Sequence, residues 1–233
     1  EAVDIAESQA YKGIIIHHPG QEHFSAGANL EEFGMAFMLD GPSAISDILE
    51  NFQNTILKLR YAKVPVVAIT HGYVFGGGCE LMLHCDHTVA AFESYIGLVE
   101  VGVGIIPGGG GCKEMALRAY NSISPEKQMQ PYLQNIAKAE VAKSALQAKE
   151  MGYLRPQDHI VFHPNECLMI AKSVVESLHL ANYLPPIAPQ IPAFGPDAAA
   201  TVDMMLVNME GGKFVSAYDR EIANAIADVM TGG

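Results

Sequence analysis

Three consecutive glycines followed by a cysteine and a glutamate, from Gly76 to Glu80, form the stretch of this chain best suited to chemistry. Glycines remove side chains where another group must approach the backbone. The first N–H groups of a helix that begins there are free to donate to an oxyanion or a phosphate. A second isolated acid, Glu100, is followed by another glycine cluster from Pro107 to Gly111. Two carboxyl groups in apolar surroundings, each beside bare backbone, indicate acid–base chemistry on a substrate that N–H groups polarise.

Strands and helices around these residues must position them. The β-branched apolar run from Val64 to Thr70 predicts a buried strand that leads into the glycines. The residues from Glu80 to Cys85 predict the first turns of a buried helix. Apolar residues at three- and four-residue steps predict a long amphipathic helix over Pro42–Tyr61. The other expected strands are Gly13–His17, His87–Phe92, a short piece at Tyr95–Leu98 and Asp158–His163, and the other expected helices are Glu1–Gln9, Cys112–Tyr120, a helical stretch over Pro125–Tyr153, Glu166–Leu178, Asp197–Met209 and Tyr218–Met230.

The composition limits the possible classes of protein. With 233 residues, 49% of them hydrophobic and 17% charged, the chain is long enough for a substantial core. The net charge of −12 argues against nucleic acid as a partner. The acidic start is not a targeting segment, and no apolar run approaches the ~20 residues that cross a bilayer. The four cysteines show no paired spacing, which fits a reducing compartment, so we expect a soluble, cytoplasmic protein with free thiols at Cys79, Cys85, Cys112 and Cys167.

Two kinds of bound group lack support in the sequence. Cys79 and Cys85 would lie about 240° apart around a helix and therefore face different sides. The histidines near the N-terminus have no carboxylate partners at ligand spacing, so no metal site is predicted at His17, His18 and His23. The dinucleotide fingerprint that begins at Gly102 fails because Pro107 stands where the third glycine would be. Binding of NAD and hydrolysis of nucleotides are therefore not expected.

The motifs Ala26–Ala28, Gly76–Glu80, Glu100 and Ile106–Gly108 together resemble the enoyl-CoA hydratase (crotonase) family, over about Gly13 to Leu178. The run from Glu100 to Gly111 and the pair Tyr218-Asp219 resemble a bacterial subgroup in which the hydratase unit follows an NAD-dependent 3-hydroxyacyl-CoA dehydrogenase. The resemblance implies an α/β fold, a crotonase-like spiral of ββα units, followed by a helical C-terminal trimerisation region. We accordingly expect a core with the active site over 1–120 and the helical region over 121–233. Relative to the family the N-terminal strands are missing, so we interpret the chain as a piece of a longer polypeptide.

The resemblance also implies roles for individual residues. The backbone N–H groups of Ala28 and Gly77 would form an oxyanion hole for the thioester oxygen. Glu80 would act on the attacking water, Glu100 would supply the α-proton, and the Gly108 N–H would help to hold the water. The reaction would be hydration of trans-2-enoyl-CoA to 3-hydroxyacyl-CoA in fatty acid β-oxidation. No separate cofactor is implied, since coenzyme A is part of the substrate.

Binding of the polyanionic coenzyme A needs local positive charge on this acidic chain. The densest basic group is Lys58, Arg60 and Lys63, and Lys63 together with Ala26 is the expected substrate-binding pair. Alternatively, the three cations are ordinary solvated charges before a strand. The family usually has Asp where this chain has Asn29, which loses a charge but retains a short side chain that can cap a helix.

Several interpretations stay open on the sequence alone. The Met- and Phe-rich stretch Leu30–Leu39 either lines a pocket for the acyl tail or belongs to the core. Glu80 is either catalytic or a helix cap, and Glu100 is either catalytic or a solvated acid at a strand end. The reaction is either hydration or isomerisation of a Δ3 double bond to Δ2. A third alternative is a non-catalytic domain that binds acyl-CoA or supports assembly with a dehydrogenase.

Overall fold

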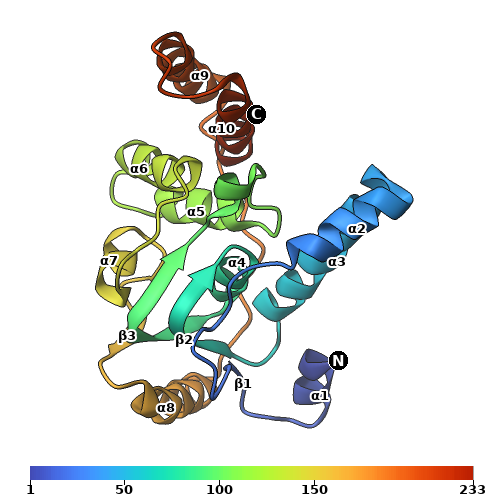
Figure 1. Ribbon diagram of the computed structural model, residues 1–233. Coiled ribbons are helices and arrows are strands. Elements are labelled where there is room, and N and C mark those ends of the chain that lie inside the picture. The colour runs from blue at the N-terminus through green and yellow to red at the C-terminus, as the bar shows by residue number, and fades with distance from the viewer. Residues whose placement is uncertain (233) are drawn as a thin grey trace.

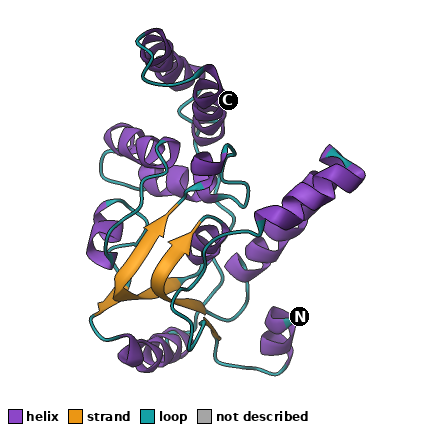
Figure 2. Ribbon diagram, in the orientation of Figure 1, coloured by secondary structure: helices purple, strands orange, loops and turns teal. Residues whose placement is uncertain are grey.

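A computed structural model of the protein describes residues 1–232, which are built around one parallel sheet (Figures 1 and 2). The sheet contains β1 (Ile14–Ile16), β2 (Val66–Phe75), β3 (His87–Gly97) and β4 (His159–Val161), side by side in chain order. Every neighbouring pair is parallel, with Ile14 opposite Val66 and Val89 opposite His159. Each connection therefore crosses over the sheet and returns, as parallel strands require.

Both faces of the sheet are covered, because alternate side chains of a strand point to opposite sides. On one face, Val67 and Ile69 of β2 pack with residues of α8 (Cys167–Leu180). On the other, Val66 and Ala68 belong to the larger core. That core is covered by α4 (Gly77–His84), α5 (Gly111–Tyr120), α6 (Pro125–Ala137) and α7 (Ala145–Glu150). The expected α/β architecture is confirmed, and the predicted run Val64–Thr70 is a buried strand from Val66 onward.

Three predicted elements differ from the structure. β2 continues beyond Thr70 to Phe75, after a register shift between Thr70 and Gly72. The two predicted strand pieces are a single strand, β3, because the polar Ser94 is fully buried and its hydroxyl donates to the Ala91 carbonyl at 2.8 Å. The predicted helical stretch Pro125–Tyr153 is interrupted between Ala137 and Ala145, and its two helices are α6 and α7.

A helical arm projects from the body of the molecule between β1 and β2 (Figure 1). It consists of α2 (Leu30–Asp40), whose N-terminus is capped by the Asn29 side chain, and α3 (Pro42–Arg60). No residue of α2 is buried, and only Ile56 of α3 is. The stretch Leu30–Leu39 is therefore not part of the core. Its exposed apolar side chains include Met35, Phe37, Met38 and Leu39.

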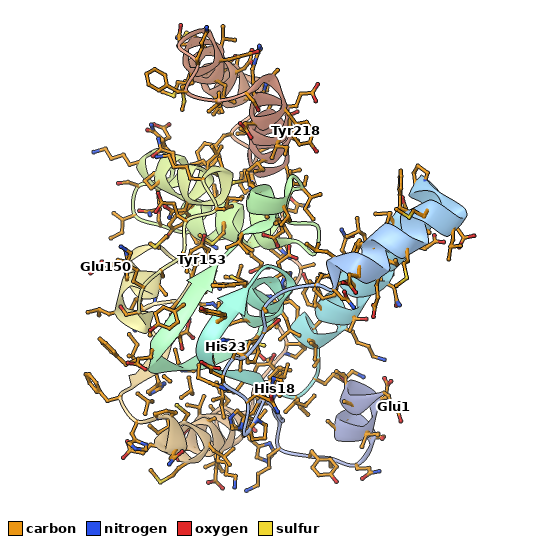
Figure 3. The ribbon with its side chains drawn as sticks, viewed as in Figure 1. Glu1, His18, His23, Glu150, Tyr153 and Tyr218 are labelled. Atoms are coloured by element: carbon orange, nitrogen blue, oxygen red, sulfur yellow. The ribbon has the colours of Figure 1, made fainter. Side chains whose placement is uncertain are left out.

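The C-terminal part begins with an extended, irregular segment that contains four prolines (Pro185, Pro186, Pro189 and Pro192) and ends before α9 (Pro196–Gly211). The final helix, α10 (Ala217–Thr231), buries Ile222 and Ile226 against α5 and α6. Its Tyr218 hydroxyl donates to the Gly104 carbonyl at 2.7 Å (Figure 3). The remaining elements are α1 (Ala2–Ser8) and two short 3₁₀ turns, η1 (Glu100–Val103) and η2 (Pro164–Glu166). None of the described helices is both long and apolar enough to span a bilayer.

Candidate active site

The junction between β2 and α4 is a tight turn centred on Gly76. Its φ of 52° lies where side chains are disfavoured, which explains a glycine at this position. The Gly76 N–H donates to the Gly97 carbonyl at 3.1 Å, and its own carbonyl accepts from the Glu80 N–H at 2.9 Å. Gly77 is the first residue of α4, so its N–H has no partner within the helix. The turn therefore offers a backbone donor at a helix N-terminus.

The loop that contains Ala26–Ala28 lies against this junction. Ser25 pairs with Val74, and its side chain occupies the space that a Cβ at Gly78 would need. The Cα of Gly27 is 3.7 Å from the position of a Cβ on Gly76. Ala26 and Ala28 are exposed. The fold thus brings the segment that leads to Ala28 onto the turn that begins with Gly76, although 49 positions (77 − 28) separate Ala28 from Gly77 in the chain.

Glu80 is buried, with 2% of its surface exposed. Its Oε1 accepts from the N–H groups of Gly109 and Gly111, both at 2.8 Å. Burial raises the pKa of Glu80 above its usual value, and the two N–H bonds, from Gly111 and Gly109, offset part of this rise. Its carboxylate therefore binds the second glycine cluster, and α4 has no side-chain cap. Glu80 therefore does not cap its own helix, but its carboxylate accepts from the first N–H of α5, so the choice between a structural and a catalytic Glu80 stays a prediction.

Glu100 begins the 3₁₀ turn η1 and is also buried, with 9% of its surface exposed. Its Oε1 is 3.3 Å from the position of a Cβ on Gly76, and its Oε2 is buried without a hydrogen-bond partner. Burial, and next the charge of Glu80, raise the pKa of Glu100 to about 7. The interpretation as a solvated acid at a strand end is therefore wrong. The two carboxyl groups differ in their partners, because two N–H donors hold Glu80 while one oxygen of Glu100 is unpaired.

The second glycine cluster is packed too tightly for side chains. A Cβ at Gly109 would lie 2.6 Å from Glu80 Oε2 and would overlap the ring of Phe52. Gly108 contributes its carbonyl, which accepts from the Gln53 amide of α3 at 2.5 Å. The predicted role of the Gly108 N–H in holding water stays a prediction. The structure adds that Gly109 and Gly111 are the donors to Glu80.

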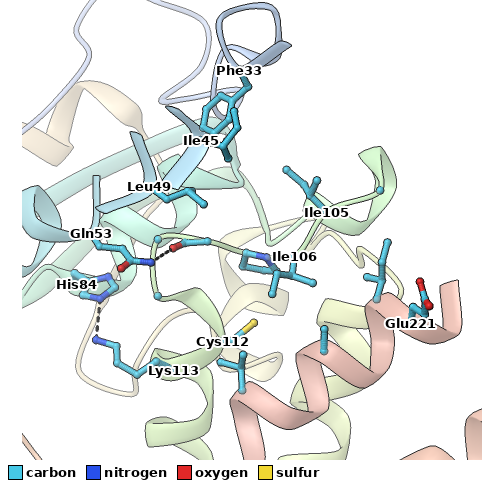
Figure 4. Close-up of a pocket in the computed structure, with 18 of the residues that line it drawn as sticks. Phe33, Ile45, Leu49, Gln53, His84, Ile105, Ile106, Cys112, Lys113 and Glu221 are labelled. Atoms are coloured by element: carbon cyan, nitrogen blue, oxygen red, sulfur yellow. Dashed lines mark hydrogen bonds between the residues drawn. The ribbon is translucent and has the colours of Figure 1, made fainter. Parts of the chain in front are cut away.

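A cavity of about 830 Å³ opens beside this cluster (Figure 4). Its walls come from α2 and α3, the end of α4, the loop between η1 and α5, the start of α5, and α10. Most of the lining is apolar, and Phe33, Leu49 and Ile106 point toward the space. Gly108, Gly109 and Gly110 also line it, whereas neither Glu80 nor Glu100 does. The Glu80 carboxylate thus lies directly behind Gly109 in the wall of an apolar chamber, while the Glu100 carboxyl lies beside Gly76.

The family model for Enoyl-CoA hydratase/isomerase matches residues 3–146, more than half of the chain. This chain belongs to the enoyl-CoA hydratase/isomerase family. Among curated proteins, the chain is 34% identical over 224 residues to the "Probable 3-hydroxyacyl-CoA dehydrogenase" of Bacillus subtilis, which covers 96% of this chain and 28% of that protein. It is 27% identical over 175 residues to the "Short-chain-enoyl-CoA hydratase" of Clostridium acetobutylicum, covering 75% of this chain and 60% of the relative.

Solved structures share the fold of this family member. An enoyl-CoA hydratase from Polaromonas sp. JS666 has a TM-score of 0.63 at 21% identity, covering 98% of this chain and 77% of that one. The match to the "Putative fatty acid oxidation complex trifunctional enzyme" of Rickettsia felis is 40% identical over 120 residues, covering 51% of this chain and 16% of the relative. The chain therefore spans less than a third of the length of these two longer relatives, from B. subtilis and R. felis.

The basic residues expected to bind coenzyme A in this family member do not act as one group. Lys58 Nζ binds Asp4 at 2.7 Å, and Arg60 lies 3.9 Å from Glu114. Lys63 is exposed and is not among the residues that line the cavity. Substrate binding by Lys63 and Ala26 stays a prediction.

Within residues 1–232, no group of three or more His, Cys, Asp or Glu is arranged to hold a metal ion.

Two polar residues in the cavity wall, His84 and Lys113, have no role in the sequence-based predictions. His84 lies in the segment Glu80–Cys85, which is predicted to be a buried helix, and it is buried with 1% exposed. It also lines the cavity, and its Nε2 lies 3.0 Å from Lys113 Nζ (Figure 4). One signal was available, because His84 follows Glu80 by four residues and must share its helix face.

Proposed function

We propose that this chain hydrates trans-2-enoyl-CoA to 3-hydroxyacyl-CoA in fatty acid β-oxidation. The observation that supports this most is the pair of buried glutamates with different surroundings. Glu80 accepts two backbone N–H bonds, which favour its ionised form, whereas Glu100 has a buried unpaired oxygen and a pKa raised to about 7. Two carboxyl groups whose environments differ in this way suit a base and an acid.

In the proposed reaction, the N–H groups of Ala28 and Gly77 donate to the thioester oxygen and stabilise the negative charge that develops there. Glu80 removes a proton from water as the water oxygen bonds to the β-carbon. Glu100 gives its proton to the α-carbon. The net change is the addition of one water molecule, and transfer of the proton from Glu80 to Glu100 restores the starting state.

The apolar chamber supports a substrate with an acyl tail. Its lining is predominantly hydrophobic, and it includes Gly109, whose N–H donates to the Glu80 carboxylate. Phe33 of α2 belongs to this lining. The proposal that the Met- and Phe-rich stretch contributes to a tail pocket therefore rests on Phe33 and not on the exposed residues further along α2.

Isomerisation of a Δ3 double bond is the second candidate reaction. In the crotonase family, isomerases often keep only the second glutamate and hydratases keep both, so the presence of Glu80 beside Glu100 favours hydration. A non-catalytic domain would not need a buried, unpaired carboxyl oxygen, since such a group costs stability. Both alternatives are therefore supported less well than hydration.

The decisive experiment follows the loss of ultraviolet absorbance when the protein is mixed with a short trans-2-enoyl-CoA. We expect conversion to the 3-hydroxyacyl-CoA, identified by mass. A cis-3-enoyl-CoA offered in parallel tests isomerisation. Absence of hydration in the full-length polypeptide, with the acyl-CoA still bound, would overturn the proposal and favour the binding-domain alternative.

We also propose that the chain works beside a 3-hydroxyacyl-CoA dehydrogenase, fused or associated, which would consume the product. The name and greater length of the B. subtilis relative support this. For assembly we propose a trimer, a proposal supported by the family resemblance and by the exposed apolar side chains of the helical C-terminal part, such as Met204 and Met209 of α9. Light scattering tests the proposed trimer, and a monodisperse monomer of the full-length protein would contradict it.

A further inference from the structure

Four charged or polar side chains form a connected cluster between α3, α4 and α5, and the proposed reaction gives them no role. His84 and Glu114 are almost fully buried, with 1% and 2% of their surfaces exposed. Lys113 Nζ lies 3.0 Å from His84 Nε2 and 2.8 Å from Glu114 Oε1. Arg60 completes the cluster, 3.9 Å from Glu114 Oε2. Buried ionic groups are costly unless they are paired. Each donor in this cluster therefore needs an acceptor, and each acceptor needs a donor.

The partners of His84 determine where its proton lies. Its Nδ1 is 2.7 Å from the backbone carbonyl of Glu80, and a carbonyl can only accept. Nδ1 therefore carries the hydrogen. The other nitrogen, Nε2, faces the ammonium group of Lys113, which can only donate. His84 is thus neutral, with Nδ1 as donor and Nε2 as acceptor.

This arrangement connects the helix of Glu80 to the helix that follows the second glycine cluster. His84 is one turn beyond Glu80 on α4, and Lys113 lies two residues beyond Gly111 on α5. The Glu80 carboxylate joins the same two elements by accepting from the N–H of Gly111. Glu80 and the first turn of α5 are therefore held together twice, once through the carboxylate and once through His84 and Lys113.

We propose that His84 and Lys113 are positioning residues for Glu80, and that their contact holds the start of α5 where its backbone N–H groups bind the Glu80 carboxylate. The role deepens the proposed hydration and rests on it. Neither residue needs to touch the reacting atoms. Displacement of a catalytic group by about 1 Å can reduce turnover by about 10²-fold, so a contact that sets the α4–α5 spacing affects the chemical step.

The contact depends on the protonation state of His84. Burial, more than any other factor, lowers the pKa of His84 to about 4, with Glu114 raising it and Lys113 and Arg60 lowering it. A protonated imidazole would have two N–H groups and could not accept from Lys113. The two cations would then repel each other. The contact is therefore intact at neutral pH and is lost as the pH falls toward about 4.

The test compares steady-state hydration by Lys113→Met, Lys113→Arg and the wild type, with Lys172→Met on α8 as a control for loss of an exposed lysine. Methionine cannot donate to His84, whereas arginine can. We expect Lys113→Met to lower kcat about 10- to 100-fold with KM within about twofold, and arginine to restore most of the loss. An unchanged kcat, or a raised KM with normal kcat, would overturn the proposal, because the latter result would mean that Lys113 binds the ligand.

A second measurement needs no turnover. In wild-type protein at pH 7, ¹⁵N NMR of His84 should show the neutral form with hydrogen on Nδ1, and ¹³C NMR of Glu80 should show its pKa rising in Lys113→Met as the N–H bonds loosen. The other tautomer, or an unchanged Glu80 pKa in a folded variant, would refute the positioning role. His84→Gln, which keeps a donor and an acceptor, replaces Lys113→Met if that variant does not fold. A wild type without hydratase activity would refute the proposed function, and the NMR results would still decide on the contact.

Discussion

The helices α4 and α2 are both apolar, but their environments are opposite. In α4, six residues, Glu80 among them, are buried. In α2 none is, and Met38 and Leu39 are 85% and 80% exposed. The difference arises from the neighbours, since α4 lies between the sheet and α5 while α2 contacts mainly α3. The comparison shows that the proposed reacting groups are held by a closed core, whereas one wall of the chamber is held by an arm with little support.

The largest expected effect concerns the two glutamates. Glu80→Gln and Glu100→Gln should each lower kcat by ~10²–10⁴-fold, because each removes a general acid or base. Met38→Ser on the arm should leave kcat within about twofold, since that side chain is exposed and does not line the cavity. Hydration kinetics with one enoyl-CoA measure all three. Turnover close to wild type in either glutamine variant would remove that residue from the mechanism.

A second contrast concerns stability. Ile226→Ala in α10 should lower the free energy of unfolding by about 2–5 kcal/mol, because the side chain is fully buried and a cavity would remain. Leu39→Ala should change it by less than about 0.5 kcal/mol. Urea denaturation followed by circular dichroism provides both values. Equal losses would show that the arm is covered in solution and would contradict the comparison.

The pH dependence follows from Glu100, whose pKa rises from 4.5 to about 7 on folding. The folded protein holds this proton more tightly than the unfolded chain, so stability falls as the pH rises from about 4.5 to about 7. Glu100→Gln should therefore raise the free energy of unfolding at pH 8, by at most about 3 kcal/mol. In the wild type, kcat/KM should decline above about pH 7 as Glu100 loses the proton that it donates. A variant less stable than wild type at pH 8 would contradict the assigned pKa.

The smallest effect is expected at the hydrogen bond between Tyr218 and Gly104. Tyr218→Phe removes only the hydroxyl that ties α10 to the loop after Glu100. We expect a loss of about 0.5–1.5 kcal/mol in the free energy of unfolding. Tyr11→Phe, an exposed tyrosine near the other end of the chain, serves as the control and should show less. Equal values in the two variants would mean that the bond contributes nothing to stability.

The sequence predicted the elements whose signals are local. The β-branched run before Gly76 predicts a strand, and the glycines that begin at Gly76 predict a turn and the start of a helix. All three are present. The continuity of β3 through Ser94 could not be predicted, because the bond from its hydroxyl to Ala91 and its contact with Thr70 form only in the folded sheet. The exposure of α2 could not be predicted either, since the composition of a helix does not determine which elements it packs against.

For the candidate site, the sequence predicted two acids beside the glycine clusters, and both are buried there, but it did not predict how each is held. The glycines from Gly108 onward were expected near the carboxylates, yet the donors to Glu80 come from Gly109 and Gly111. Which N–H groups converge depends on how the loop bends before α5. The contact of His84 with Lys113 depends on the packing of two helices, which no local pattern specifies.

The order of the strands has a consequence for how this family member can diversify. Because β1 and β2 are adjacent in the sheet whatever follows Ala28 in the connection between them, that part of the connection can lengthen or shorten without changing the pairing of any strand. The arm is this part of the connection, and both glutamates come after β2. Insertions in the arm would remodel the wall of the chamber and leave Ala28, Glu80 and Glu100 in register, so in the proposed function selectivity for the acyl chain can evolve independently of the chemical step.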